Sequence, residues 1–363
     1  MRTHLSCHEM KSRAATDMQS GSLAIWYRWS APAKRRQSTK AAVELHVNLW
    51  RRRIKTRSNK EESFIDLGFR FRDASSVSNF RIYVPFHLEQ KDIHDLGQIL
   101  HHRETLMAVF NEAYVPGDID DTGTFPIMNQ NDPAIMYCHC LRPGIDFTSS
   151  ISDQGGHIGT IINFTASLCG RFKPEVEQYI RFRVILNAQR DRAFSKLTRQ
   201  FDWIFLSAIP RDEVVEFRFN EHRSLPQEII DQMAAQEEYE QFDLRAVHCF
   251  LIRESDSHFV MSHADFHKVR LLEDNLWSKY LSGTAGGGLQ HNSFIYHWRR
   301  IGLGDTDLGD YHALAKFRRN DHRVVDHIVL CGHYSDHRYH GELGGILHLG
   351  DLALHQTFAG CAT

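Results

Sequence analysis

The sequence predicts a β-rich α+β protein, with a mostly antiparallel, sandwich- or barrel-like N-terminal domain followed by a smaller mixed α/β region. Three observations support this class: recurrent alternation of apolar and polar residues, few segments with helical spacing, and a composition typical of globular chains. The chain has 363 residues, of which 42% are hydrophobic and 24% are charged. These values exclude a disordered chain, a collagen-like chain and a coiled coil.

Five segments alternate in the way expected of strands with one apolar and one polar face. They are residues 43–49, 65–71, 80–86, 180–186 and 215–219. The first sets Val43, Leu45, Val47 and Leu49 against Glu44, His46 and Asn48. Strands of this kind favour antiparallel sheets over a parallel sheet that is buried on both faces. Pro85 is expected at a strand end or a sheet edge, because proline cannot donate to a ladder.

Three segments have helical spacing, namely residues 89–100, 225–239 and about 266–281. The second is the strongest candidate, since Ser224 can cap it and Pro226 suits its first turn. Further strands are expected at residues 22–29, 246–252, 258–262 and 293–298.

These elements divide the chain into four predicted parts. They are a disordered arm at residues 1–22, a β-rich domain at 23–222, a smaller α+β domain at 223–331 and an irregular, histidine-rich tail at 332–363. The seven cysteines are scattered and form no Cys-x-x-Cys pair, so we expect a reducing, cytoplasmic environment. The chain as written has no signal peptide and no apolar run of about 18 residues, so no transmembrane helix is expected.

Positive charge is concentrated between residues 34 and 60, although the whole chain has a net charge of −2. This segment has ten Lys or Arg residues and a single acidic residue. The candidate anion-binding residues are Arg51, Arg52, Arg53, Lys55 and Arg57. With Trp50 adjacent, they suit nucleic acid or an anionic membrane surface. The alternative, which we favour, is a basic strand end and loop that faces acids elsewhere in the fold.

Two acidic segments, residues 118–122 and 304–310, contain motifs of catalytic interest. The run Asp118-Ile119-Asp120-Asp121-Thr122 resembles the signature of haloacid-dehalogenase-like phosphatases, and the later segment resembles that family's acidic metal motif. The resemblance implies Asp118 as nucleophile, Asp120 as general acid and magnesium as cofactor. It covers only these two motifs, and the family's buried strand before the first Asp is missing. The alternative is a pair of solvated loops between strands.

Histidine is abundant, with 24 residues, but no metal-ligand set follows from the sequence. His263 and His267 are four residues apart, which suits one metal if the segment is helical, yet the Glu of the metalloprotease motif is replaced by Ala264. In Cys138-His139-Cys140, strand alternation would put both thiols on one face and the imidazole on the other. The sequence therefore assigns no metal ligands and no catalytic residues. We expect no cofactor.

The tail contains a dense group of histidines. They are His322, His327, His333, His337, His340, His348 and His355. One interpretation is chelation of a transition metal. Another is a frame shift, because His, Tyr and Asp codons read one base later encode Thr, Ile or Met, so the tail would be the shifted image of an apolar membrane anchor.

These observations favour a non-enzymatic binding, sensor or scaffold protein. Its partner would be an anionic macromolecule, a protein or a membrane surface, contacted through the basic N-terminal segment. The alternative is a magnesium-dependent phosphatase of the haloacid-dehalogenase type that uses Asp118 and Asp120. A third hypothesis is a metal-dependent hydrolase built from the histidines.

Overall fold

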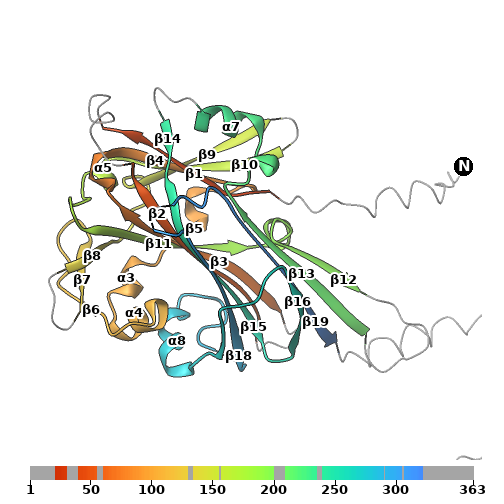
Figure 1. Cartoon of the computed structure of the whole chain (residues 1–363). Coiled ribbons are helices and arrows are strands. Elements are labelled where there is room, and N and C mark those ends of the chain that lie inside the picture. The colour runs from red at the N-terminus through yellow and green to blue at the C-terminus, as the bar shows by residue number, and fades with distance from the viewer. Residues whose placement is uncertain are drawn as a thin grey trace, which may run out of the picture.

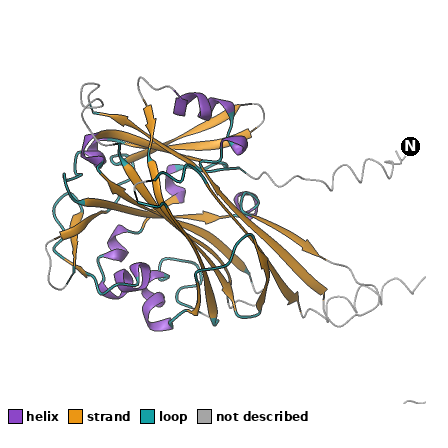
Figure 2. Ribbon diagram, viewed as in Figure 1, coloured by secondary structure: helices purple, strands orange, loops and turns teal. Residues whose placement is uncertain are grey.

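Three β-sheets form the body of the protein, and short helices cover two of their faces (Figures 1 and 2). The structure is a computed structural model. It describes residues 21–30, 40–54, 60–129, 134–154, 157–199, 209–234, 239–289, 291–304 and 306–321. The protein is therefore a β-rich α+β protein with large antiparallel and mixed sheets, as the sequence predicts.

The largest sheet has ten strands and is mixed. In spatial order they are β17 (Lys268–Leu271), β18 (Ser293–Ile301), β15 (Asp243–Glu254), β2 (Ala42–Arg53), β3 (Glu61–Arg72), β11 (Glu177–Leu186), β8 (Ala134–His139), β7 (Thr124–Met128) and β6 (Val115–Pro116), with β5 (Ile93–Asp95) also paired to β11. The β15–β2 and β11–β8 pairs are parallel, and the others are antiparallel.

The two smaller sheets are antiparallel. One has the order β14 (Tyr239–Gln241), β1 (Ala24–Trp29), β4 (Val77–Val84), β10 (His157–Phe164) and β9 (Phe147–Gln154). The other has the order β12 (Ser195–Arg199), β13 (Ile209–Phe219), β19 (Tyr311–Asp321) and β16 (Ser257–Ser262). One hydrophobic core joins residues of all three sheets, so the large sheet packs against both others through its apolar side chains.

The helices are short. They are α3 (Gly97–Leu100), α4 (Arg103–Phe110), α5 (Ala166–Cys169), α6 (Ala188–Asp191), α7 (Gln227–Ala234) and α8 (Asp274–Tyr280), with 3₁₀ turns at Ala74–Ser76, Gln90–Asp92 and His222–Ser224. The face of the large sheet that packs against the two smaller sheets is called its first face, and the opposite face its second face. Helices α3, α4 and α8 lie together against the second face (Figure 1). Among the residues that the structure describes, none of the helices is long and apolar enough to cross a membrane.

The alternating segments are strands in β2, β3, β4, β11 and β13, although β4 ends at Val84, two residues before the end of the predicted segment 80–86. Pro85 directly follows β4, as predicted for a strand end. The helix predictions were less accurate. Residues 89–100 form a 3₁₀ turn, β5 and α3 instead of one helix, because Ile93 pairs with Val184 of β11 and enters the core. Helix α7 is shorter than expected, and Tyr239 already belongs to a strand.

The third predicted helix is also wrong over its first part. Residues 268–271 form the edge strand β17, and only Asp274–Tyr280 is helical. Strands from both sides of residue 222 share all three sheets: β1 pairs with β14, β2 with β15, and β13 with β19. The division at residue 222 stays a prediction about independently folding units. The predicted arm up to residue 20 and the tail from residue 332 lie outside the described residues.

Candidate functional site

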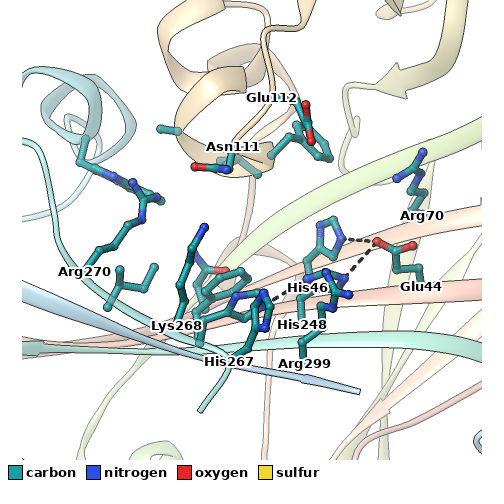
Figure 3. A pocket seen from close by; sticks show the side chains of 18 of the residues that line it. Glu44, His46, Arg70, Asn111, Glu112, His248, His267, Lys268, Arg270 and Arg299 are labelled. Atoms are coloured by element: carbon teal, nitrogen blue, oxygen red, sulfur yellow. Dashed lines mark hydrogen bonds and ion pairs between the residues drawn. The ribbon is translucent and has the colours of Figure 1, made fainter. Parts of the chain in front are cut away.

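A cavity of about 340 Å³ lies between the second face of the large sheet and helices α4 and α8 (Figure 3). Strands β2, β3, β15, β17 and β18 form its floor and one side. The end of α4, the loop that follows it and Trp277 of α8 form its roof. Its size suits a small organic ligand, because ligand pockets start at about 300 Å³. We call this cavity the sheet–helix pocket.

Strand alternation explains which side chains reach the pocket. In β2, Val43, Leu45 and Val47 enter the common core, so the intervening Glu44 and His46 face the other way. The same holds in β15, where Val247 and Cys249 enter the core and His248 lines the pocket. Because β2 and β15 are parallel neighbours with His46 opposite His248, the two imidazoles lie side by side.

A carboxylate joins these two imidazoles on the pocket floor. His46 donates from Nε2 to Glu44 Oε1 at 2.9 Å, and Nε2 of His248 lies 3.5 Å from the same oxygen. The candidate ligand atoms of Glu44, His46 and His248 all lie within 4.8 Å of one another. Among the described residues this is the one group of at least three His, Cys, Asp or Glu side chains arranged so closely. We call it the Glu–His–His cluster.

Neighbouring side chains hydrogen-bond to the two imidazoles of the cluster. Tyr179 donates its hydroxyl to Nδ1 of His46 at 3.2 Å, and Arg181 donates to the Tyr179 hydroxyl at 3.1 Å. Nδ1 of His248 and Nε2 of His297 share a hydrogen bond of 3.2 Å. Gly68, opposite His46 on β3, leaves room for Tyr179, because a Cβ there would lie 2.2 Å from its hydroxyl. These contacts fix the orientation of both rings.

The protonation states of the cluster follow from burial and from these contacts. Burial alone would raise the pKa of Glu44, but the hydrogen bond from His46 and the positive charge of Arg70 help to lower that pKa to about 2. Burial lowers the pKa of His46, and burial together with the neighbouring His46 lowers that of His248 to about 4. At neutral pH the cluster is therefore a carboxylate beside two neutral imidazoles.

Positive side chains surround the space above the cluster. Arg70 pairs with Glu177, and Arg270 pairs with Glu273 at 3.0 Å. Lys268 and Arg299 are exposed and have no ion-pair partner among the described residues. Figure 3 shows Lys268 extending from the sheet toward the loop that carries Asn111. Four cationic side chains and two acidic ones, Glu44 and Glu112, line the pocket, so its lining carries an excess of positive charge.

Aromatic side chains complete the walls of the pocket. Phe110, Tyr114 and Trp277 line the helix side, and Phe250 lies on the sheet side with its ring stacked on His297 at a centroid distance of 4.1 Å. Rings of this kind offer flat apolar surface next to the charged groups.

The predicted anion-binding arginines lie at the end of β2, and their guanidiniums contact acids of the same chain. Arg51 lies 3.2 Å from Glu213 and also pairs with Asp191. Arg52 donates to Glu62 at 2.9 Å, and Arg53 donates to Glu254 at 2.6 Å. Lys55 and Arg57 lie outside the described residues. These pairs match the favoured alternative, in which the basic segment faces acids, while anion binding by it stays a prediction.

The acidic motifs lie in exposed loops. Asp118 and Asp120 follow the two-residue strand β6 at the edge of the large sheet, where β6 pairs antiparallel with β7. Asp120 Oδ1 accepts hydrogen bonds from the backbone N–H groups of Thr122 and Thr124, both at 2.9 Å, and so closes a turn. Asp310 is exposed in the loop before β19, and Asp305 lies outside the described residues. The phosphatase hypothesis stays a prediction.

The other histidine motifs take different places. His263 and His267 lie in the loop between β16 and β17 and not on a helix. The His263 ring contacts that of His312, whereas His267 lines the pocket and contacts His297. Cys138 and Cys140 are buried in one apolar cluster, and the His139 ring packs on Phe172 of the common core. This is the alternation expected for these three residues. The tail histidines lie outside the described residues.

Sequence reasoning placed Glu44 and His46 on one polar strand face but assigned them no role, and it missed His248, His297, Lys268 and Arg299. The available signal was a histidine inside each of two predicted strands, at residues 246–252 and 293–298.

Comparison with known proteins adds no family. No protein-family model and no curated protein matches the chain. Among solved structures, it is similar to the Fcho1 Mu homology domain of Danio rerio with a bound Eps15 peptide, at 8% sequence identity and a TM-score of 0.14. That likeness covers 78% of this chain and 80% of the other. A TM-score this low carries no argument about fold or function.

Proposed function

We propose that this protein is a binding or sensor protein that holds a small organic anion in the sheet–helix pocket. The observation that carries the proposal is the pair of exposed cations, Lys268 and Arg299, which line the pocket and have no ion-pair partner among the described residues. Arginine and lysine bind phosphate and carboxylate groups by charge-assisted hydrogen bonds. The sequence predicts an anionic macromolecule, a protein or a membrane surface as partner, whereas the pocket suits a small anion and supports anion binding better than the paired arginines of β2 do.

The walls narrow the class of ligand. Phe110, Tyr114 and Trp277 provide apolar surface opposite the cations, so a ligand with a ring and an anionic group would use both. The cavity of about 340 Å³ limits this ligand to roughly the size of a mononucleotide or smaller. The described cysteines, Cys138, Cys140, Cys169 and Cys249, are free thiols, which supports our proposal of a reducing, cytoplasmic location.

Titration calorimetry with AMP, citrate and inorganic phosphate tests the proposal. We expect at least one of these probes to bind, and the double variant Lys268→Ala/Arg299→Ala to bind it at least about tenfold more weakly, because charge-assisted hydrogen bonds contribute about 1.5–3 kcal/mol each. The matched control is Arg192→Ala/Lys196→Ala, which removes two exposed cations that do not line the pocket.

The same titration compares the pocket with the basic N-terminal segment. If Lys55→Ala/Arg57→Ala weakens binding and the pocket variant does not, the contact is the N-terminal segment. Absence of binding by all three probes, or unchanged affinity in the pocket variant, would contradict the proposal.

A further inference from the structure

We propose that Glu44, His46 and His248 form a binding site for one divalent transition-metal ion on the floor of the pocket. The donor set is one carboxylate oxygen and two imidazole nitrogens. This set suits Zn²⁺ and neighbouring first-row ions better than Ca²⁺ or Mg²⁺, which prefer oxygen ligands. The site uses neither Lys268 nor Arg299, so it can be tested separately from anion binding.

Two of the three distances between the donor atoms are close to those around such an ion, and the third is no more than 4.8 Å. Ligands at about 2.0–2.1 Å from a tetrahedral Zn²⁺ lie about 3.3 Å from one another. The carboxylate oxygen of Glu44 is 3.5 Å from Nε2 of His248 and 2.9 Å from Nε2 of His46. An ion would therefore need the Glu44–His46 contact to open by about 0.4 Å and the two imidazole nitrogens to lie about 3.3 Å apart, with His46 coordinating in place of donating a hydrogen bond.

The surroundings of the cluster resemble an outer shell built for metal ligands. Ligating imidazoles usually hydrogen-bond through their other ring nitrogen, which fixes the ring. His46 does so through Nδ1 to Tyr179, and His248 does so through Nδ1 to His297. Nε2 is the atom nearest Glu44 in both rings, and when it binds the ion the single N–H of each ring lies on Nδ1. His46 then donates to the Tyr179 hydroxyl oxygen, and His248 donates to Nε2 of His297. The two histidines also stand on adjacent strands of a sheet, which is a more rigid base than a loop.

Three protein ligands leave at least one coordination position open. His46 is almost fully buried, whereas Glu44 and His248 are partly exposed to the pocket, so the open position faces the cavity. Sites with three protein ligands and one open position are typical of metals that bind or activate a water or a substrate. An ion here would also add positive charge at the end of the pocket where Glu44 now provides negative charge.

The experiment uses the full chain without an affinity tag, stripped with a chelator and titrated with Zn²⁺ alone. The tail histidines are a rival chelator, so the control variant is His333→Asn/His337→Asn/His340→Asn. We expect one tight Zn²⁺ equivalent in the natural protein and in this control. The variant His46→Asn/His248→Asn should lose that equivalent, and Glu44→Gln, which keeps shape and a hydrogen-bond acceptor, should weaken it at least about tenfold.

Further measurements distinguish the loss of a metal ligand from a folding defect. Circular dichroism and thermal unfolding verify that each variant is folded. Replacing Zn²⁺ with Co²⁺ gives visible absorption bands that report the ligands directly. The variant Tyr179→Phe removes the hydrogen-bond partner of His46 Nδ1 and should weaken metal binding about 10–100-fold. The proposal fails if the natural protein binds no Zn²⁺ at 100-fold molar excess. It also fails if Glu44→Gln binds as well as the natural protein, or if the tail variant alone loses the tight equivalent.

Discussion

The two faces of the ten-stranded sheet show how one set of strands can supply both a core and a site. The first face is apolar, and Leu45, Phe182 and their neighbours pack against the two smaller sheets. The second face, which the helices cover, carries apolar clusters as well as polar side chains, and the polar side chains form two zones. Under α8, Asp66, Arg183 and Tyr280 are buried and satisfy one another. Under α4, Lys268 and Arg299 line the pocket and have no ion-pair partner in the part of the chain that the structure describes.

The difference teaches where to look for function in a β-rich protein. A buried ion pair is costly to break but is explained by its own partners, so it points to structure. A positive charge that lines a cavity and has no ion-pair partner is not explained in that way, and it is free to pair with an anionic ligand. The predictions below test this division between the two faces and between the two zones.

The largest effect is expected from Asp66→Ala. Asp66 accepts two hydrogen bonds from Arg183, at 2.6 and 2.9 Å, and others from Tyr280 and Trp50. Its loss leaves a buried guanidinium without a carboxylate, so the free energy of unfolding should fall by about 3–5 kcal/mol. Urea denaturation measures this.

Ile65 is the matched comparison on the first face. It is the chain neighbour of Asp66, but it enters the hydrocarbon core, so Ile65→Ala should cost about 2–5 kcal/mol through the cavity that it leaves. Asp118→Ala, in an exposed loop, should change stability by no more than about 0.5 kcal/mol. A cost below about 1 kcal/mol for Asp66→Ala would show that the network under α8 does not stabilise the fold.

A smaller effect, spread over pH, is expected from His139. Burial lowers its pKa to about 4, and its ring nitrogens contact Thr124 and Gln178 at 2.9 Å. The unfolded chain takes up a proton at this residue near pH 6.5, whereas the folded chain does so only near pH 4. Stability contributed by the neutral ring is therefore present above pH 6.5 and is lost as the pH falls toward 4, by roughly 3 kcal/mol.

The variant His139→Gln isolates this contribution from that of other histidines. The difference in unfolding free energy between pH 7 and pH 4.5 should be smaller in the variant than in the natural protein. Equal differences would show that His139 has the same pKa in the folded and unfolded chains.

The smallest effect on stability is expected from Lys268→Ala/Arg299→Ala. Both side chains are exposed and unpaired among the described residues, so their removal should change the unfolding free energy by no more than about 0.5 kcal/mol. Thermal unfolding in the absence of ligand measures this. A loss above about 1 kcal/mol would mean that these cations belong to the structure, as Arg183 does, and would weaken the case for a ligand.

The sequence predicts strands better than helices in this protein for a physical reason. Alternation over residues 43–49 or 180–186 follows directly from the two faces of a strand. By contrast, Ile93 and Leu96 are spaced as on a helix, yet Ile93 belongs to a short strand and Leu96 to the turn before α3. Short apolar runs fit both periods, and only tertiary pairing selects between them.

Half of the candidate site follows from local pattern and half does not. The alternation of β2 puts Glu44 and His46 on one face, but it does not say that helices cover that face. His248 reaches His46 through the parallel pairing of β2 with β15, which joins residues about 200 positions apart. No periodicity within a single chain specifies such a partner, so the cluster becomes visible only in the structure.

That parallel pairing has a consequence for synthesis on the ribosome. Strand β2 leaves the ribosome before its neighbour β15, which is translated about 200 residues later. At the usual 5–20 residues per second, the nascent chain presents an unpaired β2 edge for about 10–40 s. Unpaired edges recruit other chains, so we expect chaperone binding during translation to increase the yield of folded protein.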